Sequence, residues 1–329
     1  MAISGFRRLT MSTETSDNTS LSLPLPWQHS LWDDFISRLD GHKLPHGLLL
    51  HGPDGIGIEH FVLALAQRLL CLSPEKSYAC GHCKACQLLK AKTHPDLIVV
   101  EPDKPGRSIL IPHIRSLCAS LENTAQQGGW KVAIIHPADA MNKFAYNALL
   151  KNLEEPQPNT LLILMSHRAG QIPATIRSRC QIENMPIPQR EDALAWLDTI
   201  DKNDKNIEML DIARGLPLLA LQYLRGDGLE ERQQMEALLE AIRQGEKLPI
   251  EAAQECQKYD ADSAVNWTMS YLHHLATGEL RDHPIPALFD FSDKLNKARG
   301  WLLSGSNINT QLLWEELFME WSQVFRQRK

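Results

Sequence analysis

The sequence has no long apolar run, no excess of positive charge and no apolar signal segment, and each absence excludes a class of protein. None of its hydrophobic runs approaches the ~20 residues that a membrane-spanning helix needs. The 34 Lys and Arg residues are outnumbered by 40 Asp and Glu, and the net charge of −6 argues against strong autonomous DNA binding. A local basic patch stays compatible with that balance. The 43% hydrophobic and 22% charged residues are typical of a soluble globular protein.

The first 22 residues are rich in Ser and Thr and contain no apolar signal core. We therefore expect residues 1–25 to form a disordered tail, with Met11 as an alternative start. The chain of 329 residues is long enough for two or three domains with real cores. Without an export signal or a membrane span, we expect a cytoplasmic protein with no membrane partner.

Short apolar runs alternate with helical patterns through the first half of the chain. The expected strands are Gly47–Leu50, Leu97–Val100, Val132–Ile135, Leu161–Leu164 and Gln181–Asn184. The expected helices cover residues 28–39, 111–123 and 140–155, the last with Met141, Phe144, Ala148 and Leu149 on one apolar stripe and Pro156 as its stop. Strands alternating with helices predict an α/β domain whose parallel sheet is buried on both faces.

After Pro188 the strand patterns end, and only helical patterns follow. Helices are expected at residues 190–200, 206–214 and 217–224, followed by a hinge at Gly226-Asp227-Gly228. The predicted fold class is therefore α/β followed by all-α. The expected domains are 26–187 for the parallel sheet, 188–228 for a small helical lid and 229–329 for a second helical domain.

The last helical domain is expected to be the main oligomerisation element. Asn309 is a plausible N-cap for a final helix that carries Leu313, Leu317, Trp321 and Val324 on one stripe. Trp314 and Phe318 lie off that stripe, so we expect them to face a neighbouring subunit. The alternative is that both stripes pack internally.

A glycine-rich loop follows the first strand and precedes a helical pattern. Gly52 and Gly57 hold the two glycine positions of the phosphate-binding pattern G-x-x-x-x-G-K-[ST], but Ile58 replaces the lysine and Glu59 replaces the hydroxyl. Isoleucine cannot neutralise phosphate charge, and a carboxylate repels a triphosphate while suiting the positive end of a helix. The sequence therefore predicts a degenerate P-loop that binds no ATP. The alternative is an ordinary Gly/Pro turn before a helix.

The end of the third strand also lacks the acidic residues of an active P-loop ATPase, in which an aspartate helps to hold magnesium. His136 and Pro137 occupy the two positions where Asp-Glu would be expected, and Asp139 comes three residues late. We interpret Asp139 as an N-cap or first-turn acid of the next helix. His136 or His94 as a catalytic base is a weaker hypothesis, because single histidines in loops are more often structural.

Four of the seven cysteines crowd into the segment Cys71-x8-Cys80-x2-Cys83-x2-Cys86. In a chain without an export signal, this pattern favours a metal over disulfides. Zinc takes four thiolates in a tetrahedron, which leaves no position for substrate, so we predict a structural zinc site. The alternatives are reduced, partly buried thiols, or His82 as one of the ligands.

Further motifs resemble those of the bacterial clamp-loader AAA+ proteins. Residues 147–156 read N-A-L-L-K-N-L-E-E-P, close to the N-A-L-L-K-x-L-E-E-P helix of that family, and Ser178-Arg179-Cys180 matches its S-R-C motif. The cysteine spacing, Thr93-His94-Pro95-Asp96 after it and the segment 300–317 also resemble the family. The resemblance runs from about residue 26 to the end. The altered glycine loop and the missing Asp-Glu separate this chain from the ATP-hydrolysing gamma/tau subunit.

The resemblance implies an AAA+ domain with an inserted zinc module, a lid and a C-terminal collar. It also implies a clamp-loader subunit of DNA polymerase III that has no catalysis of its own and acts as a stator. Its partners would be the gamma/tau and delta subunits and, through the complex, the sliding clamp and primer-template DNA. The S-R-C arginine, here Arg179, would act as an arginine finger on ATP bound by a neighbour. The alternative is an ordinary surface arginine.

Active relatives place a phosphate-sensing arginine where this chain has Leu218, and we interpret the nearby Arg214 as a C-terminal helix charge. Ser166 lies near a polar sensor position and is assigned no role. Two other function classes stay open. The chain could be a gamma/tau-like AAA+ ATPase with an unorthodox nucleotide site, or a zinc-dependent nucleic-acid-binding module. Nucleotide titration and salt-dependent DNA binding by the monomer discriminate between them.

Overall fold

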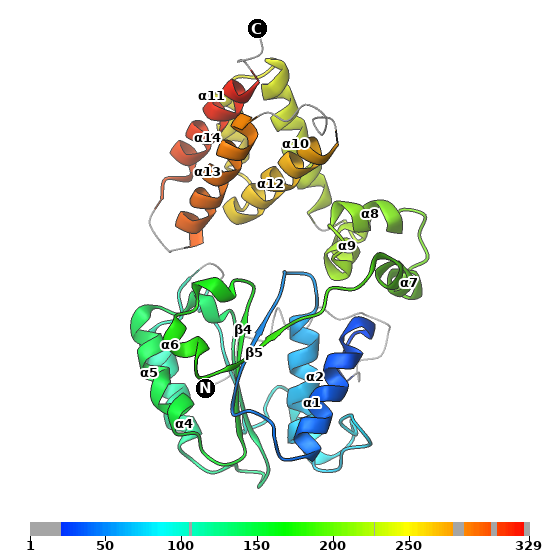
Figure 1. The fold of residues 1–329 in the computed structure, drawn as a ribbon, viewed down its shortest axis with the longest axis vertical. Coiled ribbons are helices and arrows are strands. Elements are labelled where there is room, and N and C mark those ends of the chain that lie inside the picture. Colours follow the sequence, from blue (N-terminus) through cyan, green and yellow to red (C-terminus); the bar gives the residue numbers. More distant parts are fainter. Residues whose placement is uncertain (1–20, 105–106, 227, 279–285, 304–307, 326–329) are drawn as a thin grey trace. The chain divides into compact units, whose positions relative to one another are not determined.

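The structure, a computed structural model, describes residues 21–104, 107–226, 228–278, 286–303 and 308–325 (Figure 1). The chain forms two compact units, Met1–Leu221 and Gln222–Lys329. Their boundary falls before the expected hinge, and the three helices expected to form a lid begin within the first unit. Residues 1–20 of the expected tail lie outside the described residues.

Five parallel strands form the sheet of the first unit. They are β1 Gly47–His51, β2 Leu97–Val100, β3 Lys131–Ile135, β4 Thr160–Ser166 and β5 Gln181–Asn184, in the order β2-β3-β4-β1-β5. The three central strands are buried along almost their whole length, as an apolar run in a parallel sheet requires. The predicted class, a parallel α/β sheet followed by helices, is confirmed, and each expected strand is present.

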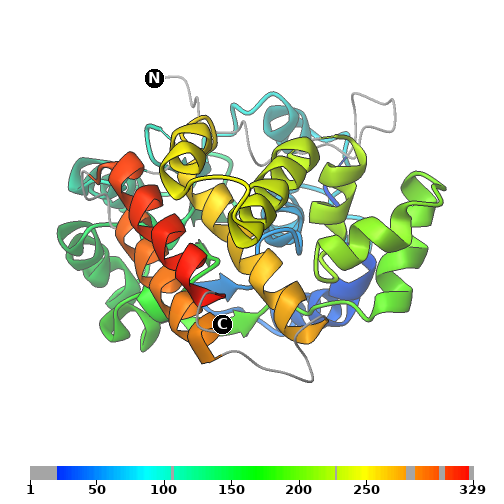
Figure 2. The ribbon, with the colours of Figure 1, turned by 90° about the horizontal axis from the view of Figure 1, so that it is seen from above.

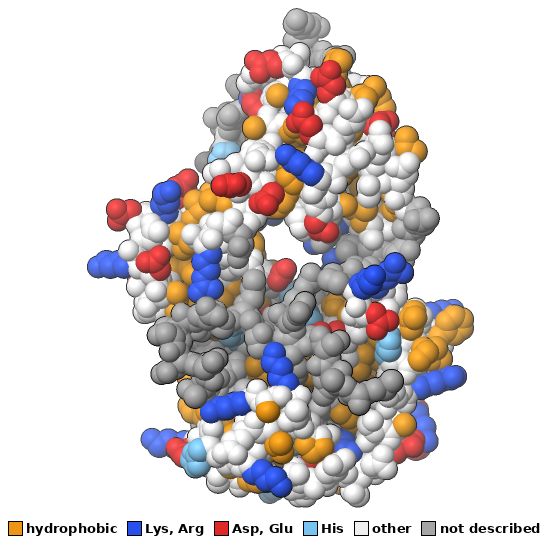
Figure 3. All heavy atoms as spheres, turned by 180° about the vertical axis from the view of Figure 1, so that it is seen from behind, with side chains coloured by type: hydrophobic (Ala, Val, Ile, Leu, Met, Phe, Trp, Pro, Cys, Tyr) orange, Lys and Arg blue, Asp and Glu red, His pale blue; other side chains and the backbone are white. Residues whose placement is uncertain are grey.

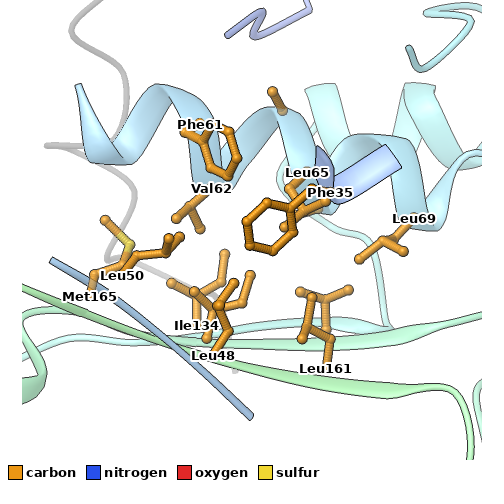
Figure 4. Packing of buried hydrophobic residues seen from close by; sticks show 14 of the residues in the cluster. Phe35, Leu48, Leu50, Phe61, Val62, Leu65, Leu69, Ile134, Leu161 and Met165 are labelled. Atoms are coloured by element: carbon orange, nitrogen blue, oxygen red, sulfur yellow. The ribbon is translucent and has the colours of Figure 1, made fainter. Parts of the chain in front are cut away.

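Helices cover both faces of this sheet (Figure 1). On one face lie α1 His29–Asp40 and α2 Ile58–Leu70, and on the other lie α4 Ile111–Leu121, α5 Lys143–Glu154 and the short α6 Ala174–Arg177. Side chains alternate along β1, so Leu48 and Leu50 pack under α2 while Leu49 joins the opposite core. Figure 4 shows Phe61, Val62 and the rest of this α2 face against the strand side chains.

One expected apolar position on α5 is wrong. Phe144 is exposed, because the helix begins at Lys143 and its buried face carries Ala145, Tyr146 and Leu149 instead. Met141 is buried but precedes the helix. The sequence pattern placed the helix start three residues too early. The helical spacing was therefore counted from Met141, which precedes the helix, and it gave the wrong buried face.

The parallel order brings the ends of non-adjacent segments together. Strands β1, β3 and β4 are paired in register, so their carboxyl ends meet at one edge of the sheet. The glycine loop, His136 and the residues after Ser166 follow those three ends. The opposite edge holds the amino ends, where Arg179 precedes β5. Ligand sites in open parallel sheets form at the carboxyl edge.

Three further helices follow the sheet, namely α7 Arg190–Ile200, α8 Asn206–Ile212 and α9 Pro217–Leu224. The first and third have the expected bounds. Helix α8 ends two residues before the expected position, because Arg214 and Gly215 both adopt positive φ and turn the chain. Trp196 of α7 packs edge-on against Trp27, with ring centroids 5.4 Å apart.

Residues 22–25, which precede the expected domain start, already contact the first unit. Ser22 donates from its hydroxyl to the carbonyl of His60 at 3.0 Å, and its N–H donates to Gln67 Oε1 at 3.0 Å. Leu25 is buried, and a short 3-10 helix spans Pro26–Gln28. The last residues of the expected tail therefore belong to the first unit.

The second unit is a bundle of five helices among the described residues, seen from above in Figure 2. They are α10 Leu229–Gln244, α11 Pro249–Cys256, α12 Ala261–Thr277, α13 Pro286–Leu303 and α14 Thr310–Val324. Asn309 caps α14 as predicted, accepting from the N–H groups of Gln311 and Leu312. Trp321 is buried at the centre, and its Nε1–H donates to the carbonyl of Leu239 at 2.8 Å.

Trp314 and Phe318 do not face outward. Both are buried in the core of the second unit, where their rings pack in a tilted arrangement with centroids 5.2 Å apart. The prediction that they contact a neighbouring subunit is therefore wrong, and the internal alternative holds. The outer surface of α14 instead carries Leu312 and Met319.

In the described part of the chain, no helix is both long enough and apolar enough to cross a membrane. On the face drawn in Figure 3, Lys and Arg side chains are scattered among Asp and Glu side chains.

Candidate functional site

The glycine loop connects β1 to α2 through residues 52–57. Gly55 and Gly57 adopt φ of 85° and 86°, a conformation that favours glycine. A Cβ at Gly57 would lie 2.4 Å from Leu25 Cδ1, so this position also needs glycine for space. The strand–loop–helix frame of a P-loop is thus present.

Ile58, at the lysine position, points into the core. It has no exposed surface and packs in the same cluster as Ile56. A Cβ built on Gly52 would lie 3.7 Å from Ile58 Cδ1, which places this side chain under the loop rather than above it. The loop therefore offers no side-chain cation from this position.

Residues from other segments of the chain donate hydrogen bonds to the carbonyl groups of the glycine loop. The carbonyl of Ile56 accepts from Trp27 Nε1 at 3.0 Å, and the carbonyl of Gly57 accepts from Gln28 Nε2 at 2.8 Å. The N–H of Leu218 donates to the carbonyl of Gly55 at 3.2 Å. Leu218 stands at the start of α9, where the resemblance expected an arginine, and its side chain lies beside Gly57. Arg214 follows the end of α8.

Glu59 and two histidines occupy the carboxyl edge next to the loop. Glu59 lies in the first turn of α2, and its Oε1 is 3.8 Å from Nε2 of both His136 and His167. The two imidazole rings are edge to face, with centroids 6.0 Å apart. Burial lowers the pKa of His136 below its ordinary value. Sequence reasoning missed His167, although a histidine directly after β4 must share the edge with one directly after β3.

Asp139 caps no helix, but it is an acid in the first turn of the 3-10 helix that follows β3, so one of the two expected roles holds and the other is wrong. It lies in a short 3-10 turn, Ala138–Ala140, and Asn142 caps α5 by accepting from the N–H of Ala145. Asp139 Oδ1 instead accepts from the hydroxyl of Ser166 at 2.6 Å. Ser166, which was assigned no role, is buried and links β4 to this turn.

Arg179 lies at the other edge of the sheet, just before β5. Its Nε donates to Glu154 Oε1 at 2.8 Å, and its Nη1 donates to the carbonyl of Thr175 at 3.0 Å. Its side chain is 36% exposed. Glu154 closes α5, so one ion pair joins the S-R-C motif to the N-A-L-L-K-N-L-E-E-P helix.

The glycine loop and Arg179 are separated by the length of a strand. The carbonyl of Arg179 lies 3.2 Å from a Cβ built on Gly47, the first residue of β1, whereas the loop follows its last residue. Four residue steps at ~3.3 Å each amount to ~13 Å along the strand. Arg179 therefore lies far from the phosphate position of its own loop.

The four clustered cysteines are brought together. Cys71 ends α2, Cys83 caps α3 Lys84–Lys90, and all four Sγ atoms lie within 4.8 Å of one another. The Sγ of Cys71 is 3.5 Å from that of Cys80, and the Sγ atoms of Cys80 and Cys86 are 4.0 Å apart. Tetrahedral zinc with Zn–S bonds of ~2.3 Å needs Sγ atoms ~3.8 Å apart. The donors therefore fit a zinc ion.

Hydrogen bonds to the cluster sulfurs favour the thiolate form of Cys80, whereas burial opposes it at Cys86. The Ser73 hydroxyl bonds to Cys80 and lowers the pKa of its thiol to about 5, whereas burial raises the pKa of Cys86. Backbone N–H groups of Cys80 and Cys83 point at cluster sulfurs, at 3.3 and 3.4 Å. His82 lies outside the group, exposed, with Nδ1 2.8 Å from the carbonyl of Cys80.

Comparisons with known proteins agree with these features. A family model described as DNA polymerase III, delta subunit, matches residues 27–188. The chain is 36% identical to DNA polymerase III subunit delta′ of Pseudomonas aeruginosa, covering 91% of this chain and 97% of that protein. It is 29% identical to the subunit of the same name from Escherichia coli, covering 89% and 94%. The sheet, the loop and these relatives define a DNA polymerase III subunit.

The chain belongs to the family of DNA polymerase III subunit delta′. Among solved structures, it resembles a gamma subunit-related protein of DNA polymerase III from Thermotoga maritima, with a TM-score of 0.48 and 15% identity over 89% of this chain and 100% of that one. A RuvB mutant of the same organism gives a TM-score of 0.44 at 15% identity, over 90% of each chain.

Proposed function

We propose that this chain is the non-hydrolysing stator of a DNA polymerase III clamp loader. It assembles in the cytoplasm with gamma/tau and delta subunits and helps to place the sliding clamp on primer-template DNA. It supplies Arg179 to ATP held by a neighbour. The observation that carries the proposal is the placement of Arg179 at the amino edge, a strand length away from a loop that has no lysine.

The geometry of Arg179 supports action in trans. An arginine finger stabilises charge on the transferring phosphoryl group and must reach it directly. Because ~13 Å of strand separates Arg179 from its own loop, it cannot serve that loop. A neighbour that presents its nucleotide to this edge would meet a guanidinium already oriented by Glu154.

The altered loop supports the absence of ATP on this chain. Ile58 fills the core instead of presenting a cation, and Glu59 puts a carboxylate at the sequence position where an active P-loop has its magnesium-binding hydroxyl. The contacts from Trp27, Gln28 and Leu218 hold the loop by protein groups alone. A loop anchored in this way suits a rigid subunit.

Calorimetric titration with ATP and magnesium tests the nucleotide part of the proposal. We expect no binding heat up to millimolar ATP, because the lysine, the hydroxyl and the acid after β3 are all replaced. Ile58→Lys should not restore hydrolysis, since His136 still stands at the acid position. The ATP-hydrolysing gamma/tau subunit is the positive control. Micromolar affinity in the wild-type chain would favour the alternative, an AAA+ ATPase with an unorthodox site.

The second unit is the proposed collar that joins the subunits. Its apolar residues fill its own core, but Leu312 and Phe289 remain exposed on α14 and α13. We expect deletion of residues 229–329 to abolish assembly with gamma/tau and delta while leaving the first unit folded, because that unit has separate cores. Size-exclusion chromatography with the partner subunits measures this. Stable assembly by residues 23–228 alone would contradict the proposal.

A further inference from the structure

Three metal-binding side chains converge at the carboxyl edge of the sheet from three different elements. Glu59 comes from the first turn of α2, His136 follows β3 and His167 follows β4. One donor atom from each lies within 4.8 Å of the other two. The side chains are largely buried, with exposed fractions of 20% for Glu59, 11% for His136 and 25% for His167.

Glu59 faces the two histidines at ion-pair distance but makes no hydrogen bond to either. The distances of 3.8 Å from Glu59 Oε1 to the two Nε2 atoms exceed the length of a hydrogen bond. His136 Nδ1 is also buried, and it has no hydrogen-bond partner among the described residues. This nitrogen is not the one nearest Glu59, so it calls for a buried water rather than for the proposed ion.

The orientation of His167 suits a ligand. Its Nδ1 lies 3.0 Å from the carbonyl of Gly52, and a carbonyl can only accept, so Nδ1 carries the proton. In the neutral ring the lone pair then lies on Nε2, the nitrogen 3.8 Å from Glu59 Oε1. Metal-binding histidines are commonly held in this way, with the second ring nitrogen donating to a backbone carbonyl.

Two of the three positions correspond to magnesium-binding positions of an active P-loop protein. In an active P-loop protein, the hydroxyl after the lysine and the acid after the third strand hold magnesium. Here Glu59 and His136 stand at those two positions, and His167 adds a third donor from the next strand. Replacing hard oxygen ligands by imidazole shifts the preference from magnesium toward zinc and related metals.

We propose that Glu59, His136 and His167 form a second metal site, which binds zinc or a similar divalent transition metal in place of magnesium nucleotide. Two imidazole nitrogens and one carboxylate form a common zinc ligand set that leaves one position open. Bonds of ~2.0–2.1 Å place tetrahedral donors ~3.4 Å apart, so each side chain needs only a small inward rotation. The ion would tie α2, β3 and β4 together and fix the loop without nucleotide. This inference does not depend on the arginine-finger role.

Zinc titration of the full chain tests the site. The protein is first saturated with zinc, and loosely held metal is removed by dialysis, so that zinc remains on the four cysteines. Calorimetry and elemental analysis then count the zinc bound on re-addition. We expect one further ion per chain, absent from His167→Gln and Glu59→Gln. His42→Gln, which removes an exposed histidine outside the site, should keep it.

Cobalt distinguishes the two sites by colour. Cobalt held by thiolates shows strong sulfur charge-transfer absorption, whereas cobalt held by nitrogen and oxygen shows only weak d–d bands. We expect the added cobalt to give weak bands alone, and His167→Gln to weaken its affinity by more than the ~10–100-fold typical of losing a supporting contact. Circular dichroism checks that the variants are folded. A wild-type chain that takes up no second ion, or variants that bind it unchanged, would overturn the proposal.

Discussion

Replacing Arg179 by alanine is expected to lower ATP hydrolysis at the neighbouring gamma/tau site by ~10³–10⁵-fold, the contribution of an arginine finger. Other sites in the ring should be less affected. The measurement is ATP turnover by the loader reconstituted with clamp and primed DNA, with single-turnover kinetics to resolve the affected site. Assembly is verified for each variant by size-exclusion chromatography.

The change should cost little stability. Arg179 and Glu154 are 36% and 48% exposed, and solvent-exposed ion pairs contribute ~0–1 kcal/mol. A lower rate of ATP hydrolysis in the Arg179→Ala ring would therefore reflect the missing guanidinium and not unfolding of the subunit. Arg179→Lys should rescue poorly, because an ammonium lacks the planar fork that bonds both Glu154 and Thr175. Arg177→Ala, at the exposed end of α6 two residues earlier, is the matched control, and it should leave turnover unchanged. An unaltered rate in an assembled Arg179→Ala ring would remove the finger role.

The ion pair between Arg179 and Glu154 allows a second test of the finger role. The guanidinium of Arg179, our proposed finger, is oriented by a carboxylate on its own chain, at 2.8 Å from Nε. Glu154→Gln keeps a hydrogen-bond acceptor while removing the charge. If Glu154 only orients Arg179, this variant should lower turnover far less than Arg179→Ala does.

Much of the fold follows from the sequence, because parallel strands buried on both faces are continuous apolar runs. The segment Leu161–Leu164 is such a run, and it lies within β4. Which face of each helix is buried followed less directly from the sequence. The stripe that included Phe144 was wrong because a cap at Asn142, rather than the apolar spacing, fixes where α5 begins. Trp314 and Phe318 show a similar limit, since a second apolar stripe can face a second layer of the same bundle.

The site was predictable wherever one local motif defines it. The cysteine spacing and the missing lysine are read directly from the chain. Contacts between distant segments were not, because they depend on strand order. The pair Ser166–Asp139, the approach of His167 to Glu59 and the bond from Glu154 to Arg179 all join residues from separate elements. Each of these contacts can be inferred once the order of β1, β3, β4 and β5 in the sheet is known, and none can be inferred without it.

Cys83→Ser is expected to abolish binding of the zinc ion that we predict at the four clustered cysteines. Cys83 belongs to both C-x2-C steps, and its sulfur also accepts from the N–H of Cys86 while capping α3. Binding of zinc by structural sites contributes ~10–16 kcal/mol in small zinc domains, so three remaining thiolates should not retain the ion against a chelator. Helix α3 should lose order as a result.

The sheet should survive this loss. The cysteines form a small cluster of their own, separate from the cores on the two faces of the sheet. Elemental analysis of anaerobically purified protein measures the metal, and loss of cobalt–thiolate absorption assigns it to this site. Far-ultraviolet circular dichroism should show only a small decrease in helix. Cys118→Ser, the same exchange at a cysteine outside the cluster, should leave the absorption intact. Wild-type protein that carries no zinc, or a Cys83→Ser variant that keeps full cobalt–thiolate absorption, would contradict the assignment.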